Sequence, residues 1–182
     1  FEISKIRNEE NARYLKITGK EMLLYQKILS YIMCLNPLKK IYSNNLEDKE
    51  FKQEDLWSFG ISGDLPIIFA RISEVNDVYV IKDLLKVFNF FKNKNITVDL
   101  VILNEERNVY ERYVKDAILR EIANMNLSYL INNRIFILNA DEIENKDILS
   151  FKANLTINTH LGSLENIILE LEEEYLQRYK ME

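Results

Sequence analysis

The side chains that could carry out chemistry in this sequence follow its apolar runs. Three such runs end near residues 72, 103 and 139, and a weaker fourth run ends near residue 159. Ligands of open parallel sheets bind outside the carboxyl ends of the strands. If the runs are parallel strands, the polar residues after them meet at one edge of the sheet and form a candidate pocket. The predicted pocket residues are Glu74, Asn104, Glu105, Asn139 and Asp141, with Ser73 and His160 beside them.

Two carboxylates of this set fit two kinds of chemistry. Glu105 and Asp141 could hold Mg²⁺ through oxygen ligands, or they could act as a general acid and base pair. The alternative is structural, because Asn and Asp at strand ends commonly cap the next helix or close an Asx turn. No nucleophile with its base is readable, and His160 alone cannot make a metal site. We therefore predict no catalytic residue, cofactor or metal ligand, and keep the strand-end pocket as a hypothesis.

Residues 60–64, GISGD, contain two closely spaced glycines. Such glycines can let backbone donors approach a phosphate. A nucleotide-binding glycine loop, however, follows a strand and opens a helix, whereas this stretch precedes the first apolar run. Its spacing also matches no phosphate-binding pattern. We therefore predict a structural turn in which Gly60 or Gly63 has a positive φ.

Trp57, the only tryptophan, lies just before this turn and close to Phe59. These two aromatic side chains could form a sugar-stacking platform, since aromatic rings pack against the apolar face of a pyranose. The alternative is burial of Trp57 under the N-terminal helix, because a large aromatic side chain beside a core strand usually contributes its area to packing. The sequence favours burial.

Composition limits the class of protein. The chain has 182 residues, a formal net charge of -5, and 47% hydrophobic and 29% charged residues, as expected for a globular domain with one core. We expect neither nucleic acid nor a membrane surface as a partner, because the net charge attracts neither. No apolar run is long enough to span a bilayer. The chain starts with Phe1 rather than Met, and we expect it to be a segment of a longer protein.

Hydrophobic periodicity predicts the elements that would position these residues. Strands are predicted at residues 65–71, 97–103, 134–139 and, less buried, 154–159. Helices are predicted at residues 20–33, 77–93, 109–125, 146–152 and 164–179. Their predicted N-terminal signals are a capping box of Thr18 and Glu21 and the caps Asn76 and Ser163.

Strands that alternate with helices predict parallel pairing, and right-handed crossovers place helices on both faces of the sheet. We therefore expect an α/β fold: a three-layer α/β/α sandwich of about four mainly parallel strands, preceded by an α-helical N-terminal arm. Residues 1–55 are expected to form the arm and a polar loop over 36–55, and residues 56–182 the α/β domain. Phe1, Ile3 and Ile6 are expected to face a neighbouring domain.

Several strings of this sequence resemble an internal segment of bacterial cyclic β-1,2-glucan synthases. These strings are LWSFGISGDLPIIFARI at 56–72, TVDLVILNEE at 97–106, YERYVKDAI at 110–118, IFILNADEI at 135–143 and GSLEN at 162–166. The resemblance spans nearly the whole chain. It implies a parent protein that is a very large membrane enzyme of the glycosyltransferase type with a phosphorylase-like C-terminal region.

The resemblance also implies a role for the segment itself. It implies a non-catalytic accessory domain on the cytoplasmic side of the bacterial inner membrane, without membrane contact of its own. The implied partners are the flanking domains of the same polypeptide and a β-glucan. No motif in this sequence matches the catalytic carboxylates of the family, which belong to other segments. The alternative is a small α/β enzyme or Mg-binding domain that uses the strand-end carboxylates.

Overall fold

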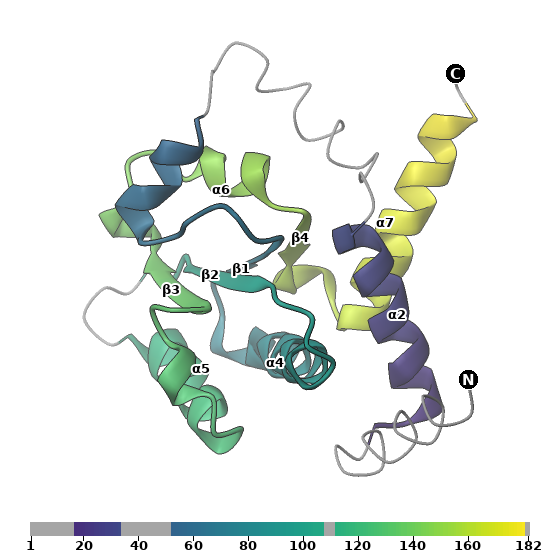
Figure 1. The fold of residues 1–182 in the computed structure, drawn as a ribbon, viewed down its shortest axis with the longest axis horizontal. Coiled ribbons are helices and arrows are strands. Elements are labelled where there is room, and N and C mark those ends of the chain that lie inside the picture. Colours follow the sequence, from purple (N-terminus) through teal and green to yellow (C-terminus); the bar gives the residue numbers. More distant parts are fainter. Residues whose placement is uncertain (1–16, 34–51, 108–111, 181–182) are drawn as a thin grey trace.

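A four-stranded parallel sheet forms the centre of the molecule (Figure 1). The computed structural model describes residues 17–33, 52–107 and 112–180. Its strands are β1 (Ile67–Ile72), β2 (Asp99–Asn104), β3 (Ile135–Asn139) and β4 (Leu155–Asn158). Every pairing between them is parallel, and the order across the sheet is β3-β2-β1-β4. The predicted α/β class and the parallel strands are therefore confirmed.

The described helices agree closely with the hydrophobic periodicity. They are α2 (Gly19–Met33), α4 (Val78–Asn93), α5 (Tyr113–Asn124), α6 (Asp147–Lys152) and α7 (Leu164–Tyr179). Short 3-10 helices lie between them: η1 (Gln53–Phe59), η2 (Val75–Asp77), η3 (Ser128–Leu130), η4 (Ala140–Glu142) and η5 (Thr159–Leu161). The first residues of the helix predicted over 109–125 lie outside the described part of the chain. Phe1, Ile3, Ile6 and most of the loop predicted at 36–55 also lie outside it.

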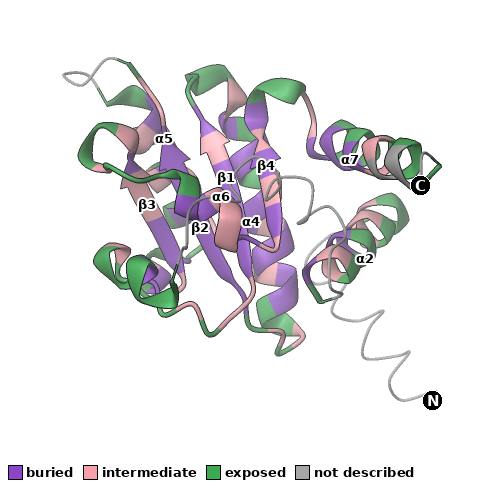
Figure 2. Ribbon diagram, turned by 90° about the horizontal axis from the view of Figure 1, so that it is seen from above, coloured by how far each residue is buried: buried purple, intermediate pink, exposed green. Residues whose placement is uncertain are grey.

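Alternating strand side chains divide the core into two layers, because successive residues of a strand point to opposite faces of the sheet. Ile68 and Ala70 of β1 pack on the face covered by α4 and α5, in a cluster that also contains buried residues of α2 and α7. Phe69 of β1 and Val101 of β2 pack on the other face, with residues of η1 and α6. Figure 1 shows these helices on opposite sides of the sheet, and Figure 2 shows the buried strands between them. The three-layer arrangement is therefore confirmed.

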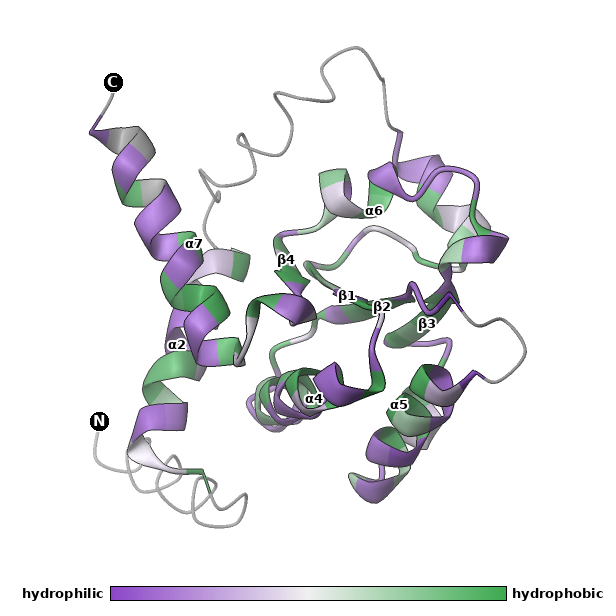
Figure 3. Cartoon of the chain, turned by 180° about the vertical axis from the view of Figure 1, so that it is seen from behind, coloured by the Kyte–Doolittle hydropathy of each residue, from purple (hydrophilic) through white to green (hydrophobic). Residues whose placement is uncertain are grey.

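Two helices close the β4 end of the sheet, where α2 and α7 lie side by side (Figures 1 and 2). The Lys27 ammonium of α2 lies 3.0 Å from a carboxylate oxygen of Glu172 in α7. Asn154 joins α2 to the sheet, because its Oδ1 accepts a hydrogen bond from the Ile67 N–H at 3.0 Å and its Nδ2 donates to the Ile32 carbonyl at 3.2 Å. Figure 3 shows that α7 becomes largely hydrophilic toward its C-terminal end. The N-terminal helix α2 thus packs into the same core as the strands.

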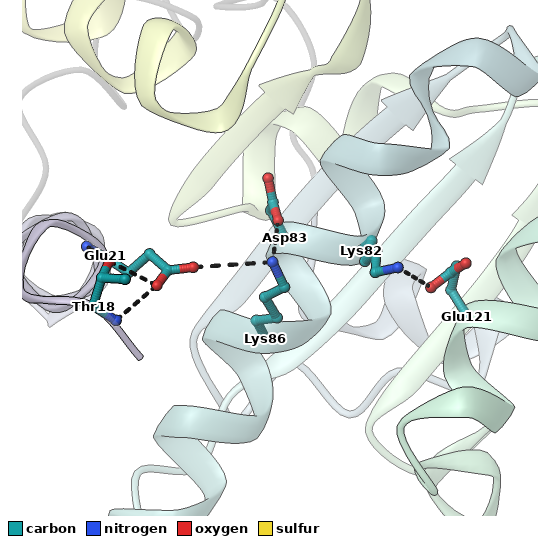
Figure 4. A network of polar contacts seen from close by, with 6 residues as sticks. All are labelled: Thr18, Glu21, Lys82, Asp83, Lys86 and Glu121. Carbon is teal, nitrogen blue, oxygen red and sulfur yellow. Dashed lines mark hydrogen bonds and ion pairs between the residues drawn. The ribbon is translucent and has the colours of Figure 1, made fainter. Parts of the chain in front are cut away.

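Charged side chains link α4 to both neighbouring helices (Figure 4). The Lys86 ammonium lies 2.8 Å from Asp83 in the same helix and 4.0 Å from Glu21 in α2. The Lys82 ammonium lies 3.4 Å from Glu121 Oε2 in α5, as an ion pair that lacks hydrogen-bond geometry. Partly exposed pairs of this kind each contribute little to stability. The apolar core therefore remains the main cause of the helix positions.

Two of the predicted helix N-terminal signals are confirmed. The Thr18 N–H donates to Glu21 Oε2 at 2.8 Å, and the Glu21 N–H donates to Thr18 Oγ1 at 3.3 Å. The hydrogen bond from the Thr18 backbone lowers the pKa of Glu21, because it stabilises the carboxylate. Ser163 Oγ accepts a hydrogen bond from the Asn166 N–H at 3.3 Å, at the start of α7. Local side-chain chemistry therefore fixes where these two helices begin.

The predicted cap at Asn76 is wrong. Asn76 lies inside η2, and α4 begins after Asp77, whose side chain makes no capping hydrogen bond. The Asp77 N–H instead donates to the Glu74 carbonyl at 3.1 Å. A backbone turn thus replaces the side-chain cap at this helix.

Candidate functional site

The carboxyl ends of β1 and β2 border a groove of about 870 Å³. Its walls come from the segments after these two strands and from the starts of α5 and α6. Its charged and aromatic side chains are Glu74, Glu105, Glu106, Arg107, Tyr113 and Lys146. Two of the five predicted pocket residues, Glu74 and Glu105, therefore line a common groove.

Glu105 is held in this groove by Arg71, near the end of β1. Arg71 Nε donates to Glu105 Oε2 at 3.1 Å, and Arg71 Nη2 donates to Glu105 Oε1 at 2.8 Å. Both carboxylate oxygens therefore accept a hydrogen bond in the two-point geometry that arginine favours. The Glu105 N–H also donates to the Ile72 carbonyl at 2.7 Å, which extends the pairing of β1 and β2. This arrangement fixes the carboxylate at the rim of the groove.

The neighbouring polar residues stabilise the local backbone. Asn104 Oδ1 accepts a hydrogen bond from the Glu106 N–H at 3.1 Å, which closes an Asx turn at the end of β2. Glu106 Oε2 accepts one from the Val114 N–H at 3.2 Å, at the start of α5. A carboxylate is favoured at a helix N-terminus because backbone N–H groups are unpaired there. Asn104 and Glu106 therefore have structural roles in this loop.

The other predicted residues lie apart from Glu105. Asn139 lines a second groove, of about 670 Å³, and its Nδ2 donates to Glu142 Oε1 at 2.9 Å. Asp141 is exposed on η4 and lines neither groove. His160 is exposed on η5, beyond the end of β4. The structure thus gathers Glu74 and Glu105 but not Glu105 and Asp141.

Within residues 17–33, 52–107 and 112–180, no group of three or more His, Cys, Asp or Glu side chains could hold a metal ion. In the same part of the chain, every helix is too short or too polar to cross a bilayer.

The glycine turn lies before β1, at the amino end of the strand. The first groove lies at the opposite, carboxyl end. Gly60 has φ 74° and Gly63 has φ 76°, so the prediction of positive φ is confirmed for both. A Cβ atom at Gly63 would lie 2.9 Å from Gln53 Cγ, too close for an ordinary contact. Gln53 Nε2 donates to the Ser62 carbonyl and to Asp64 Oδ1, both at 2.9 Å. The turn is therefore built closely around the Gln53 side chain.

The predicted burial of Trp57 is wrong, because this side chain is 61% exposed. The neighbouring Leu56 is 1% exposed and packs in the core instead. A 3-10 helix has three residues per turn, so Leu56 and Phe59 of η1 share the face toward the sheet and Trp57 points away. Trp57 Nε1 donates to the Ser62 carbonyl at 3.3 Å. Trp57 and Phe59 therefore do not form a common platform.

Asp99 is a buried carboxylate at the amino end of β2. Its side chain is 1% exposed, and Arg134 Nη1 lies 3.4 Å from its Oδ1. Burial raises the pKa of Asp99, because it disfavours the charged form, and the Arg134 cation opposes this shift. The signal in the sequence was a single acidic residue at the start of an otherwise apolar run. Asp99 was not among the predicted site residues.

The chain matches no protein-family model. It is similar to the cyclic beta-(1,2)-glucan synthase NdvB of Rhizobium meliloti (strain 1021), with 26% identity over 141 residues. The aligned region covers 76% of this chain but 5% of the relative, so the chain spans a small part of that protein. The chain is therefore related to a small part of a cyclic β-1,2-glucan synthase.

Proposed function

We propose that this chain is a non-catalytic accessory domain of a cyclic β-1,2-glucan synthase and acts in glucan metabolism. The observation that carries the proposal is the similarity over 76% of this chain to 5% of a glucan synthase. The described residues of this chain form an α/β layer structure with an apolar core on each face of its sheet. Such a unit can space and support the flanking domains of the same polypeptide.

The contacts of the strand-end residues support a structural role. Both oxygens of Glu105 already accept hydrogen bonds from Arg71, and Asn104 closes a turn. The alternative, a small enzyme or Mg-binding domain, would use the carboxylate of Glu105. In this structure that carboxylate is already paired with Arg71.

The proposal includes the setting of the domain. We place it on the cytoplasmic side of the bacterial inner membrane as part of a larger membrane protein. Its proposed partners are the flanking domains and a β-glucan, without nucleic acid and without its own contact to the membrane. The relationship to the glucan synthase and the family resemblance of the sequence support this part of the proposal.

Turnover assays test the absence of catalysis. The chain is incubated with UDP-glucose, with linear β-1,2-glucan, and with that glucan plus phosphate, and the products are measured by mass spectrometry. We expect each substrate to remain unchanged. Turnover that Glu105→Gln or Asp141→Asn removes, and that the exposed control Glu173→Gln leaves intact, would overturn the proposal in favour of a small enzyme.

A second assay tests the accessory role within a glucan synthase that contains this domain. Leu56→Ala weakens the core of the domain, since Leu56 is 1% exposed. We expect this change to lower the amount of folded synthase and to leave glucan synthesis per folded enzyme unchanged. A normal amount of folded enzyme with lower synthesis per enzyme would contradict an accessory role.

A further inference from the structure

We propose that the exposed face of Trp57 binds a glucose unit of a β-glucan, so that η1 and the turn after it form a carbohydrate-binding subsite. The choice of glucan as ligand rests on the proposed function. The site itself rests on the position, support and surroundings of one aromatic ring.

The ring of Trp57 is both accessible and fixed. It is 61% exposed, although Leu56 beside it is buried. Its indole N–H donates to the Ser62 carbonyl at 3.3 Å, which restrains the orientation of the ring while most of the side chain stays exposed. A side chain that is ordered before binding loses little conformational entropy when the ligand arrives. Trp57 is therefore prepared for stacking before any sugar is present.

The turn over residues 60–64, which supplies the acceptor for Trp57, is held by side-chain hydrogen bonds of its own. The Ser62 carbonyl that accepts the Trp57 N–H also accepts a hydrogen bond from Gln53 Nε2 at 2.9 Å. Gln53 Nε2 donates to Asp64 Oδ1 as well, at 2.9 Å. Gly63 keeps φ 76°, and a Cβ atom there would meet the Gln53 side chain. Gln53 thus holds the carbonyl that orients Trp57, and Asp64 holds the Gln53 side chain in turn.

The surroundings of Trp57 are polar and favour a sugar over a protein partner. Gln53, Ser58, Ser62 and Asp64 are all exposed on η1 and the turn. Among the described residues, the other large apolar side chains with high exposure lie on other elements. A protein interface usually surrounds its central tryptophan with further buried apolar contacts. A pyranose has a small apolar face edged by hydroxyl groups, which matches a single exposed ring on an element whose other exposed side chains include amide, hydroxyl and carboxylate groups.

The chain contains one tryptophan, so tryptophan emission, excited selectively over that of the tyrosines, reports on this site alone. The probe is a linear β-1,2-linked glucose oligosaccharide, added to the full chain at millimolar concentrations. We expect a saturable change in tryptophan emission. Ligand-observed NMR extends the measurement to variants without tryptophan. An absence of saturable binding by both methods would overturn the proposal.

Three variants locate the site. Trp57→Ala should weaken binding at least tenfold, and Trp57→Phe should retain part of it because a smaller ring still stacks. Tyr129→Ala is the matched control, since Tyr129 is an equally exposed aromatic residue at 64% on another element. Its binding should equal that of the wild type. The melting temperature of each variant confirms that it is folded.

Two further results would overturn the proposal. Loss of binding in Tyr113→Ala with normal binding in Trp57→Ala would place the sugar in the groove at the strand ends. Normal sugar binding in Trp57→Ala, together with loss of association between this chain and the flanking region of its polypeptide, would make Trp57 a protein contact. In both cases the turnover assays above still decide the accessory role independently.

Discussion

Arg71 and Glu105 form a two-point ion pair between neighbouring strands, with nitrogen to oxygen distances of 3.1 Å and 2.8 Å. Arg71 lies in β1, and Glu105 immediately follows β2. Their side chains are 41% and 22% exposed. The pair therefore connects the two central strands at their carboxyl ends, where the groove opens.

This geometry predicts a measurable coupling between the two residues. A double-mutant cycle with Arg71→Gln and Glu105→Gln should give a coupling free energy of about 1 kcal/mol, at the upper end for a partly exposed pair. The cycle is measured by urea unfolding. The single-contact pair of Lys27 and Glu172 is the matched control and should give a smaller coupling. Equal couplings would show that the two-point geometry adds nothing.

The two glycines of the turn should differ in their response to alanine. Gly63→Ala should lower the free energy of unfolding by more than about 1 kcal/mol, because it adds a clash with Gln53 to the strain of a positive φ. Gly60→Ala should cost less, since a Cβ atom there meets nothing within 4 Å and only the backbone strain remains. Urea unfolding of both variants gives the order. The reverse order would contradict the contact to Gln53.

Substitutions at two adjacent residues of η1 should lower stability by very different amounts. Leu56→Ala should cost about 2 to 5 kcal/mol, because it leaves a cavity in the core between η1 and the sheet. Trp57→Ala should cost about 1 kcal/mol or less, because most of its surface is already in water. Thermal unfolding of the two variants measures the contrast. A large loss in Trp57→Ala would mean that the ring is buried after all.

Asp99 should make stability fall as pH rises. Burial raises its pKa in the folded state above the ordinary aspartate value of about 3.9. Between these two pKa values the folded state binds more protons than the unfolded state, so the free energy of unfolding decreases with pH in that range. The contribution is complete below the unfolded pKa and is lost as pH rises through the folded pKa.

Two variants check the assignment to Asp99. Asp99→Asn cannot titrate, so its stability relative to the wild type should increase from pH 4 upward, as measured by urea unfolding at several pH values. Arg134→Gln removes the cation that opposes the effect of burial, so the pKa of Asp99 should rise further and the fall should extend to higher pH. A constant difference between Asp99→Asn and the wild type at every pH would exclude a role of Asp99.

The sequence was sufficient to predict the strands, the helices and most helix starts. These features depend on local signals, such as apolar periodicity and the reciprocal bonds of Thr18 and Glu21. The order of the strands was not predicted, because the pattern of β4 fits either edge of the sheet. Its place beside β1 depends on long-range pairing, which local periodicity does not specify.

The candidate site was predicted only in part for a similar reason. Parallel strands do bring Glu74 and Glu105 to one groove, as their positions after apolar runs indicated. The partner of Glu105 was not predicted, since Arg71 lies within an apolar run and its direction depends on the phase of the strand. Trp57 was placed wrongly because the three-residue period of η1 turns it away from the face that Leu56 occupies.

The position of β4 beside β1 has a consequence for the order in which the chain folds. Asn154 contacts Ile67 across 87 residues of sequence, and Lys27 contacts Glu172 across 145. Closing such long loops costs chain entropy before the contacts can form. We therefore expect β4, α7 and their pairing with α2 to form more slowly than the β1-α4-β2-α5-β3 region. Until those steps are complete, β1 has an unpaired edge and α2 lacks its partner helix. During synthesis the ribosome must therefore release the chain through β4 before the fourth strand can pair with β1.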